Sequence, residues 1–232
     1  MKVDKKIKLK SKSWKFDKLT VPDFDNHVKK SVPFYDVSHD LTTQISSFFL
    51  KEKSVCYDLG SSTGVLLDKI SKHNLDKKLN LIGIDESNSM VKRAKKKFPK
   101  INFKKNRLEK SKLKKNDLTI SLYTMQFVQP KYRQLIYNKI FKSLNWGGAF
   151  VLFEKIRAND ARFQDLMNFL YFDFKKNNGL SKEEILNKEQ SLRSVLDPYT
   201  LKANLDFLKR AGFKDVMPIC QYLSFIGLLA IK

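Results

Sequence analysis

Short apolar runs alternate with amphipathic segments through the first two thirds of the chain. Buried strands are predicted at residues 54–59, 79–85, 101–103, 118–122 and 149–154. Helices with an apolar period near 3.6 residues are predicted between them, at residues 63–73, 88–98 and 130–144, and another precedes the first strand at residues 38–50. Continuous apolar strands that alternate with helices form a parallel sheet covered on both faces. The pattern therefore predicts an α/β fold.

The last third of the sequence has a different pattern. Two helices are predicted at about residues 159–178 and 181–194, and Ser181 with Glu184 forms a capping box for the second. Another helix begins at Thr200 and ends at Gly212. The apolar segments 215–220 and 222–231 then form a terminal hairpin. These elements complete a seven-stranded, mostly parallel sheet with an antiparallel C-terminal hairpin.

Positive charge is concentrated in two segments. The 232 residues carry a formal net charge of +22, of which residues 1–20 hold +6 and residues 92–115 hold +12. This clustering is typical of a surface that contacts RNA phosphates. Lysine outnumbers arginine by 39 to 7, however, and an AT-rich genome is the favoured explanation of that excess. We expect residues 1–20 to form a basic tail and residues 21–232 a single domain.

Metal and membrane functions have little support in the sequence. Cys56 and Cys220 lack the spacing of a metal site, and the three histidines are scattered, so no metal site is predicted. The longest apolar stretch, residues 222–231, is far shorter than a membrane span. The first ten residues lack the apolar region of a signal peptide. These features indicate a cytoplasmic protein.

The segment from Tyr57 to Gly64 contains the main ligand-binding signal. It reads Tyr-Asp-Leu-Gly-Ser-Ser-Thr-Gly and joins the first predicted strand to the following helix. Glycines at such a turn allow close backbone approach to a ligand, and the helix start offers free N–H groups. Asp85 ends the neighbouring strand, where an acid accepts hydrogen bonds from ribose hydroxyls. The Gly60-x-x-x-Gly64 spacing with Asp58 and Asp85 favours S-adenosylmethionine (SAM) over a dinucleotide, although a plain tight turn would use glycine too.

From about Phe24 to the C-terminus, the sequence resembles the carboxy-SAM synthase family, which has the class I methyltransferase (Rossmann-like) fold. The shared motifs, in order, are Ser31-Val32-Pro33-x-Tyr35, Asp58-Leu59-Gly60, Ile84-Asp85, Thr124-Met125-Gln126-Phe127, Leu144-Asn145-x-Gly147-Gly148-Ala149, Glu154-Lys155, Asp173-Phe174-Lys175, Asn178-Gly179 and Ala211-Gly212-Phe213. The family uses prephenate to convert SAM into carboxy-SAM for modification of the tRNA wobble uridine. The resemblance also implies a homodimer.

By the resemblance, several side chains and glycines contact the cofactor. These are Tyr35, Gly60, Ser61, Ser62 and Asp85, and the pattern of the turn adds Asp58 and Gly64 as cofactor contacts. The cofactor role of Tyr35 is favoured, although plain core packing would also explain a tyrosine after Pro33-Phe34. Asp173, Glu154 and Lys155 could line the substrate pocket, although an ion pair at the strand end explains the last two as well.

Three predicted cofactor contacts differ from the residue that the family has there, and Leu108 beside them can still contact the adenine ring. Glu86 replaces an asparagine and can still accept a ribose hydrogen bond. Arg107 replaces an aspartate beside the adenine amino group, from which a cation cannot accept a hydrogen bond. Leu108 can still contact the ring, and Asn106 could replace the missing acceptor if the loop shifts. Leu122 replaces an asparagine after the fourth strand.

The largest departure lies in the helix after the capping box. The family has an arginine that pairs with the new carboxylate of carboxy-SAM, and here that position is Glu189, with Arg193 one turn later. Two carboxylates about 4 Å apart repel by about 4 kcal/mol at an effective dielectric constant near 20. Glu189 would then disfavour carboxy-SAM. Alternatively, Glu189 and Arg193 form a surface pair, or Arg193 reaches the site itself.

Three functions remain open from the sequence. Methyl transfer from SAM to an unidentified acceptor is favoured slightly, because Glu189 opposes a carboxylated product. Carboxy-SAM synthesis is the alternative that the resemblance implies. A non-catalytic RNA-binding module with this fold is the third, suggested by the departures at Arg107 and Leu122. No catalytic residue is assigned by the pattern.

Overall fold

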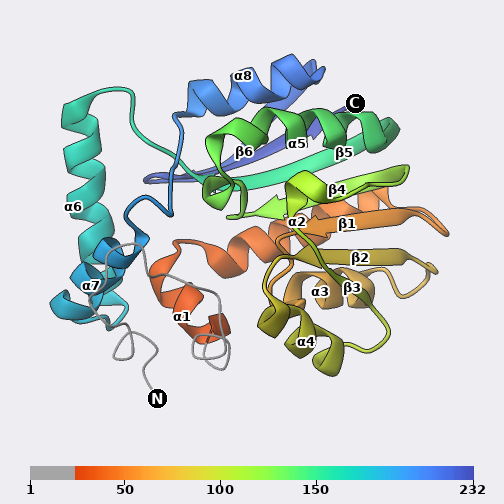
Figure 1. The fold of residues 1–232 in the computed structure, drawn as a ribbon, viewed down its shortest axis with the longest axis horizontal. Helices are drawn as coiled ribbons and strands as arrows, with labels where there is room; N and C mark the ends of the chain where they lie inside the picture. Colours follow the sequence, from red (N-terminus) through yellow and green to blue (C-terminus); the bar gives the residue numbers. More distant parts are fainter. Residues whose placement is uncertain (1–23) are drawn as a thin grey trace.

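A seven-stranded sheet forms the centre of the molecule (Figure 1). The computed structural model describes residues 24–232, with strand order β3-β2-β1-β4-β5-β7-β6. Strands β1 to β5 are parallel, and β7 is antiparallel to both β5 and β6. The strands are β1 (Val55–Leu59), β2 (Asn80–Asp85), β3 (Asn102–Lys105), β4 (Asn116–Leu122), β5 (Leu144–Lys155), β6 (Asp215–Tyr222) and β7 (Phe225–Ile231). The predicted fold class is confirmed.

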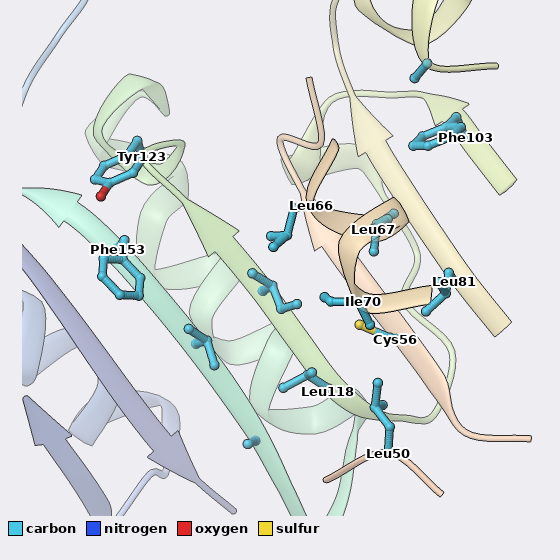
Figure 2. Close-up of a cluster of buried hydrophobic side chains, with 14 of the residues drawn as sticks. Leu50, Cys56, Leu66, Leu67, Ile70, Leu81, Phe103, Leu118, Tyr123 and Phe153 are labelled. Carbon is cyan, nitrogen blue, oxygen red and sulfur yellow. The ribbon is translucent and has the colours of Figure 1, made fainter. Parts of the chain in front are cut away.

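Helices cover both faces of the sheet, as apolar strands require. One face packs against α2 (Tyr35–Phe49), α3 (Val65–His73) and α4 (Asn88–Lys97), and the other against α5 (Pro130–Ser143) and α8 (Leu201–Ala211). Figure 2 shows Leu66, Leu67 and Ile70 of α3 lying over Cys56 of β1. Because alternate strand residues point to opposite faces, Tyr57 belongs to the core cluster on the other side.

Three helices lie apart from the two layers. These are α1 (Phe24–Ser31), α6 (Ala161–Asn177) and α7 (Lys182–Leu192), which Figure 1 shows together at one end of the molecule. The Tyr171 hydroxyl of α6 donates a 2.6 Å hydrogen bond to the Ser31 carbonyl, which ties α6 to the end of α1. Ser181 and Glu184 form the predicted capping box of α7. This group of helices forms a wall facing the carboxyl ends of the parallel strands.

Several boundaries differ from those that the sequence predicts. The helix expected to begin at Ser38 begins at Tyr35, because Phe34 takes the left-handed conformation (φ 56°) and starts the turn. The Ser38 hydroxyl bonds to the Tyr35 carbonyl inside the helix instead. Helix α1 has only eight residues, and the sequence pattern does not predict it. Strand β5 begins at Leu144, before the glycine pair expected to precede it. The basic tail predicted at residues 1–20 lies outside the described residues.

No helix within residues 24–232 combines the length and the apolar character needed to cross a lipid bilayer.

Candidate SAM-binding site

A cavity of about 860 Å³ lies at the carboxyl ends of β1, β2 and β4. Its floor includes Asp58 and Asp85 from the strand ends, and its opposite wall includes Tyr171 of α6 and Lys188 of α7. The strand order changes direction between β1 and β4, and ligands of open α/β sheets bind beside such a switch point. The volume falls within the range of about 300–1,000 Å³ of small-molecule sites.

The turn after β1 is shaped for close approach. The Gly60 and Ser61 N–H groups both donate to the Ile84 carbonyl, at 2.7 and 3.1 Å, which joins the turn to β2. Gly60 has φ +84°, and a Cβ atom there would lie 2.0 Å from the Thr124 hydroxyl oxygen. Both observations require glycine at this position.

Ser61 carries a polar atom that the protein leaves unused. Its side chain is buried, and its hydroxyl oxygen has no hydrogen-bond partner among the described residues. Ser61 also lines the cavity. The hydroxyl oxygen lies against Gly83 of β2, where a Cβ atom would come within 2.6 Å of it, so the turn and the strand enclose it. Ser62 follows with φ 47°, and its N–H donates to Asp85 at 2.9 Å.

Two carboxyl groups lie below the turn, Asp58 buried and Asp85 half-buried. Asp85 accepts hydrogen bonds from the N–H groups of Ser62 and Ser87, at 2.9 and 2.8 Å, and burial raises its pKa. Asp58 is 3% exposed. Burial, and then the charge of Asp85, raises the pKa of Asp58 to about 7. A cationic ligand group beside Asp58 would favour its ionised form.

Arg107, which the family resemblance places beside the adenine amino group, is paired with acidic side chains. The Arg107 guanidinium lies 2.9 Å from Glu109 and 3.8 Å from Glu86, so two acids hold it at the cavity rim. Asn106 accepts a hydrogen bond from the Arg107 N–H and also lines the cavity. Leu108 and Leu122 are apolar residues that line the cavity, and Leu122 stands where the family has an asparagine.

Tyr35 closes one side of the cavity. Its ring stacks on Tyr123 at 6.1 Å and lies 4.4 Å from the His39 ring. Burial, followed by the charges of Asp25 and Asp58, raises the pKa of Tyr35. Tyr35 therefore lines the cavity and also packs against the hydrophobic core.

Gly64 and the two residues predicted to contact substrate lie outside the cavity lining. Gly64 is the N-cap of α3, and a Cβ atom there would lie 2.5 Å from the Phe103 ring, so it serves close packing. Glu189 forms a 2.7 Å ion pair with Lys175. Arg193 is the exposed C-cap of α7, and no ion pair joins it to Glu189 within the described part of the chain.

Lys155 and Glu154 point to opposite sides of β5. Glu154 is buried and accepts a 2.9 Å hydrogen bond from the Met125 N–H, and burial raises its pKa to about 8. Lys155 lines the cavity, with its ammonium 4.5 Å from the centre of the Tyr171 ring. The two side chains therefore do not form the ion pair considered from the sequence. Strand alternation is the signal that separates them.

Lys188 and α1 line the cavity, although the sequence pattern assigns them no role in the site. The Lys188 ammonium donates to the Ser31 hydroxyl at 2.9 Å and contacts the His27 ring nitrogen. Thr63 in the turn donates a 2.6 Å hydrogen bond to Asp25 of α1. These contacts join segments that are far apart in sequence, so no local pattern predicts them.

The comparisons with known proteins agree with this geometry. Residues 56–148 match the family model described as a methyltransferase domain. The chain is 38% identical over 222 residues to a carboxy-S-adenosyl-L-methionine synthase of Staphylococcus epidermidis, covering 94% of this chain and 97% of that protein. The corresponding synthase of Nautilia profundicola is 35% identical over 225 residues, covering 95% of each.

Solved structures share the fold at low sequence identity. A plantazolicin methyltransferase in complex with a substrate analogue and SAH has a TM-score of 0.68 and 18% identity, covering 99% of this chain and 96% of that one. Human N-acetylserotonin methyltransferase in complex with SAM has a TM-score of 0.62 and 19% identity, covering 89% of this chain and 54% of that one. At such identities the likeness concerns the fold.

Proposed function

The chain belongs to the carboxy-S-adenosyl-L-methionine synthase family of SAM-dependent transferases, and on that premise we propose that it makes carboxy-SAM from SAM, with prephenate as the carboxylate donor. Prephenate loses its ring carboxylate as carbon dioxide together with its ring hydroxide, which makes the ring aromatic. The carbon dioxide replaces one hydrogen of the SAM methyl group as a carboxylate, and the displaced proton leaves with the hydroxide as water. The new group is anionic, so its binding site needs a cation and must not present a carboxylate in its place.

The position of Glu189 is the observation that carries this proposal. The sequence favours methyl transfer only because Glu189 would repel a carboxylated product. Glu189 instead binds Lys175, and it is not among the residues that line the cavity. Away from the adenine side, the lysines and arginines that do line it are Lys155, Arg157 and Lys188. The electrostatic objection to carboxy-SAM therefore does not apply at this cavity.

The residues present also fit SAM itself. The Gly60 turn allows a ligand to approach its backbone closely, and Ser61 and Ser62 of the same turn line the cavity. Asp58 provides a carboxyl group for the cationic amino acid end. Asp85 and Glu86, at the end of β2, provide acceptors for the ribose hydroxyls. Leu108 provides an apolar surface for the adenine ring.

A direct assay tests the proposal. The purified protein is incubated with SAM and prephenate, and the products are identified by mass spectrometry alongside any small molecule that co-purifies. Carboxy-SAM formation supports the proposal. SAM binding without carboxy-SAM, together with S-adenosylhomocysteine released when candidate acceptors are added, would instead assign methyl transfer. Failure to bind SAM would leave the RNA-binding alternative.

A polyanionic partner is a second, separate part of the proposal. Of the thirteen cations in residues 92–115, all except Arg93 are exposed, and they lie along α4, the edge strand β3 and the following loop. We define these exposed side chains as the basic surface. Phosphates of tRNA are the partner that this charge fits best.

A further inference from the structure

We propose that the Lys155 ammonium binds the carboxylate of carboxy-SAM, the role that the family resemblance gives to position 189. This inference rests on the proposed function, because it identifies the cation that the reaction needs. The shared Glu154-Lys155 motif does not by itself give Lys155 this role, since an ion pair at the strand end would explain the motif equally well.

The backbone holds Lys155 firmly at the cavity. The Lys155 N–H donates a 2.7 Å hydrogen bond to the side-chain oxygen of Gln126, and Lys155 pairs with Phe225 across β5 and β7. Because Glu154 precedes it and points into the opposite side of the sheet, the Lys155 side chain is directed to the cavity. Its position therefore follows from the sheet itself.

Two aromatic rings contact the Lys155 ammonium. Its nitrogen lies 4.5 Å from the centre of the Tyr171 ring and 6.0 Å from that of Phe225. The Tyr171 hydroxyl bonds to the Ser31 carbonyl, which fixes that ring. Contacts with aromatic rings position an ammonium group by electrostatic attraction. They leave N–H donors of that ammonium available to a carboxylate. Lys155 thus keeps donors that a ligand can use.

A neighbouring lysine shows what distinguishes Lys155. The Lys175 ammonium lies 4.3 Å from the same Tyr171 ring, but it is almost fully buried and bonded to Glu189 at 2.7 Å. Among residues 24–232 no carboxylate lies within ion-pair distance of Lys155, although the charge of Glu189 acts on it, and Lys155 lines the cavity where Lys175 does not. Glu189 thereby neutralises the buried lysine and leaves Lys155 as the cation available to an anionic ligand.

The other lysines and arginines of the cavity lining are less suited to the role. Lys188 already donates to the Ser31 hydroxyl and contacts His27. Arg107 is paired with two acids at the adenine side. Arg157 is exposed to solvent, which screens its charge. A partly buried ammonium at the cavity wall binds a carboxylate more strongly than an exposed cation, because less solvent competes with the contact.

The test measures the affinities of the full chain for carboxy-SAM and for SAM by calorimetry, and compares their ratio between variants. Lys155→Met removes the charge and keeps most of the stem. We expect it to reduce the preference for carboxy-SAM by roughly ten- to a hundredfold, the usual value of a hydrogen bond to a charged group. Lys155→Arg should retain much of the preference. Lys176→Met, at an exposed position of α6, is the matched control and should leave the ratio unchanged.

The outcomes separate this inference from the proposed function. If the unaltered protein binds SAM but forms no carboxy-SAM from SAM and prephenate, the proposed function fails. If it forms carboxy-SAM and shows no preference for binding it over SAM, the function stands and the assignment of Lys155 fails. If it prefers carboxy-SAM and Lys155→Met retains that preference, the function stands and the assignment of Lys155 is overturned. A preference that disappears in Lys155→Met and largely persists in Lys155→Arg supports the assignment, and SAM binding by each variant shows that the site is folded.

Discussion

Lys175 and Glu189 form an ion pair that joins α6 to α7 at 2.7 Å, and the two partners differ greatly in exposure. The Lys175 side chain is 4% exposed, whereas that of Glu189 is 55% exposed. Without Glu189, the lysine would be left buried and unpaired, whereas without the lysine Glu189 could be hydrated. The pair is therefore asymmetric in what each partner contributes to stability.

This asymmetry predicts unequal effects of removing either partner. Glu189→Ala should lower the free energy of unfolding by about 1–3 kcal/mol, the cost of a buried unsatisfied group. Lys175→Met should lower it by about 1 kcal/mol or less, because an apolar side chain of similar length replaces the ammonium. Urea unfolding of both variants and the double variant measures the coupling. A larger decrease for Lys175→Met than for Glu189→Ala would contradict this expectation.

Gly60 provides a test of the turn after β1. Gly60→Ala should weaken SAM binding at least tenfold, because the new Cβ atom would lie 2.0 Å from the Thr124 hydroxyl oxygen and the φ of +84° is unfavourable for alanine. Calorimetry with SAM measures the effect. Gly147→Ala is the matched control, since Gly147 has φ +74° but no atom within 4 Å of its Cβ position. Equal SAM affinity in the two variants would show that the close approach of Thr124 is unimportant.

The sequence is sufficient to predict the sheet and most of the cofactor turn. Apolar runs and capping residues locate the strands and most helices, since those signals are local. All predicted cofactor residues except Gly64 line the cavity. Gly64 differs because glycine serves ligand approach and close packing equally well, and only the position of Phe103 distinguishes them.

The substrate side of the cavity could not be predicted in the same way. Glu189 is conspicuous in the sequence because it replaces an arginine, but its partner Lys175 lies on another helix. The α6–α7 arrangement that brings them together is tertiary, and helical periodicity does not reveal it. Lys155 is ambiguous for a similar reason, because its contact with Tyr171 joins residues from a strand and a distant helix.

Asp58 predicts a proton linkage for SAM binding. Its pKa is raised to about 7 by burial and then by Asp85, so near neutral pH the carboxyl is partly protonated before the ligand binds. A cationic ligand group lowers that pKa, so binding should release a proton, and SAM affinity should rise as the pH increases from about 6 to about 8. Calorimetry in buffers with different ionisation enthalpies counts the protons released.

Substitution of Asp58 tests whether its carboxyl group is the one that releases the proton. Asp58→Asn should weaken SAM binding and flatten its pH dependence over that range. Asp40→Asn changes an exposed acid that pairs with Lys69 away from the cavity and should have neither effect. An unaltered pH dependence in Asp58→Asn would assign the proton to another group.

The basic surface predicts salt-dependent binding of tRNA. Lys104 and Lys105 are exposed on β3, the edge of the sheet. Replacing both with Gln should reduce the slope of log affinity against log salt concentration by up to about one unit for each phosphate that these lysines neutralise. Replacing Lys176 and Lys182, exposed residues outside this surface, is the control. Affinity that hardly changes with salt in the unaltered protein would argue against phosphate contacts.

Lys155 predicts how carboxy-SAM binding depends on pH. Burial, and then the charges of Lys175 and Arg157, lowers its pKa to about 8, while Glu189 acts in the opposite direction. A bound carboxylate favours the ammonium, so the complex takes up a proton when it forms above about pH 8, and affinity should fall as the pH rises from about 8 to about 9.5. Lys155→Arg, whose guanidinium stays charged, should remove this fall. SAM affinity measured over the same range corrects for Asp58 and other groups. If the decline persists in Lys155→Arg, the ammonium of Lys155 is not the group that binds the carboxylate.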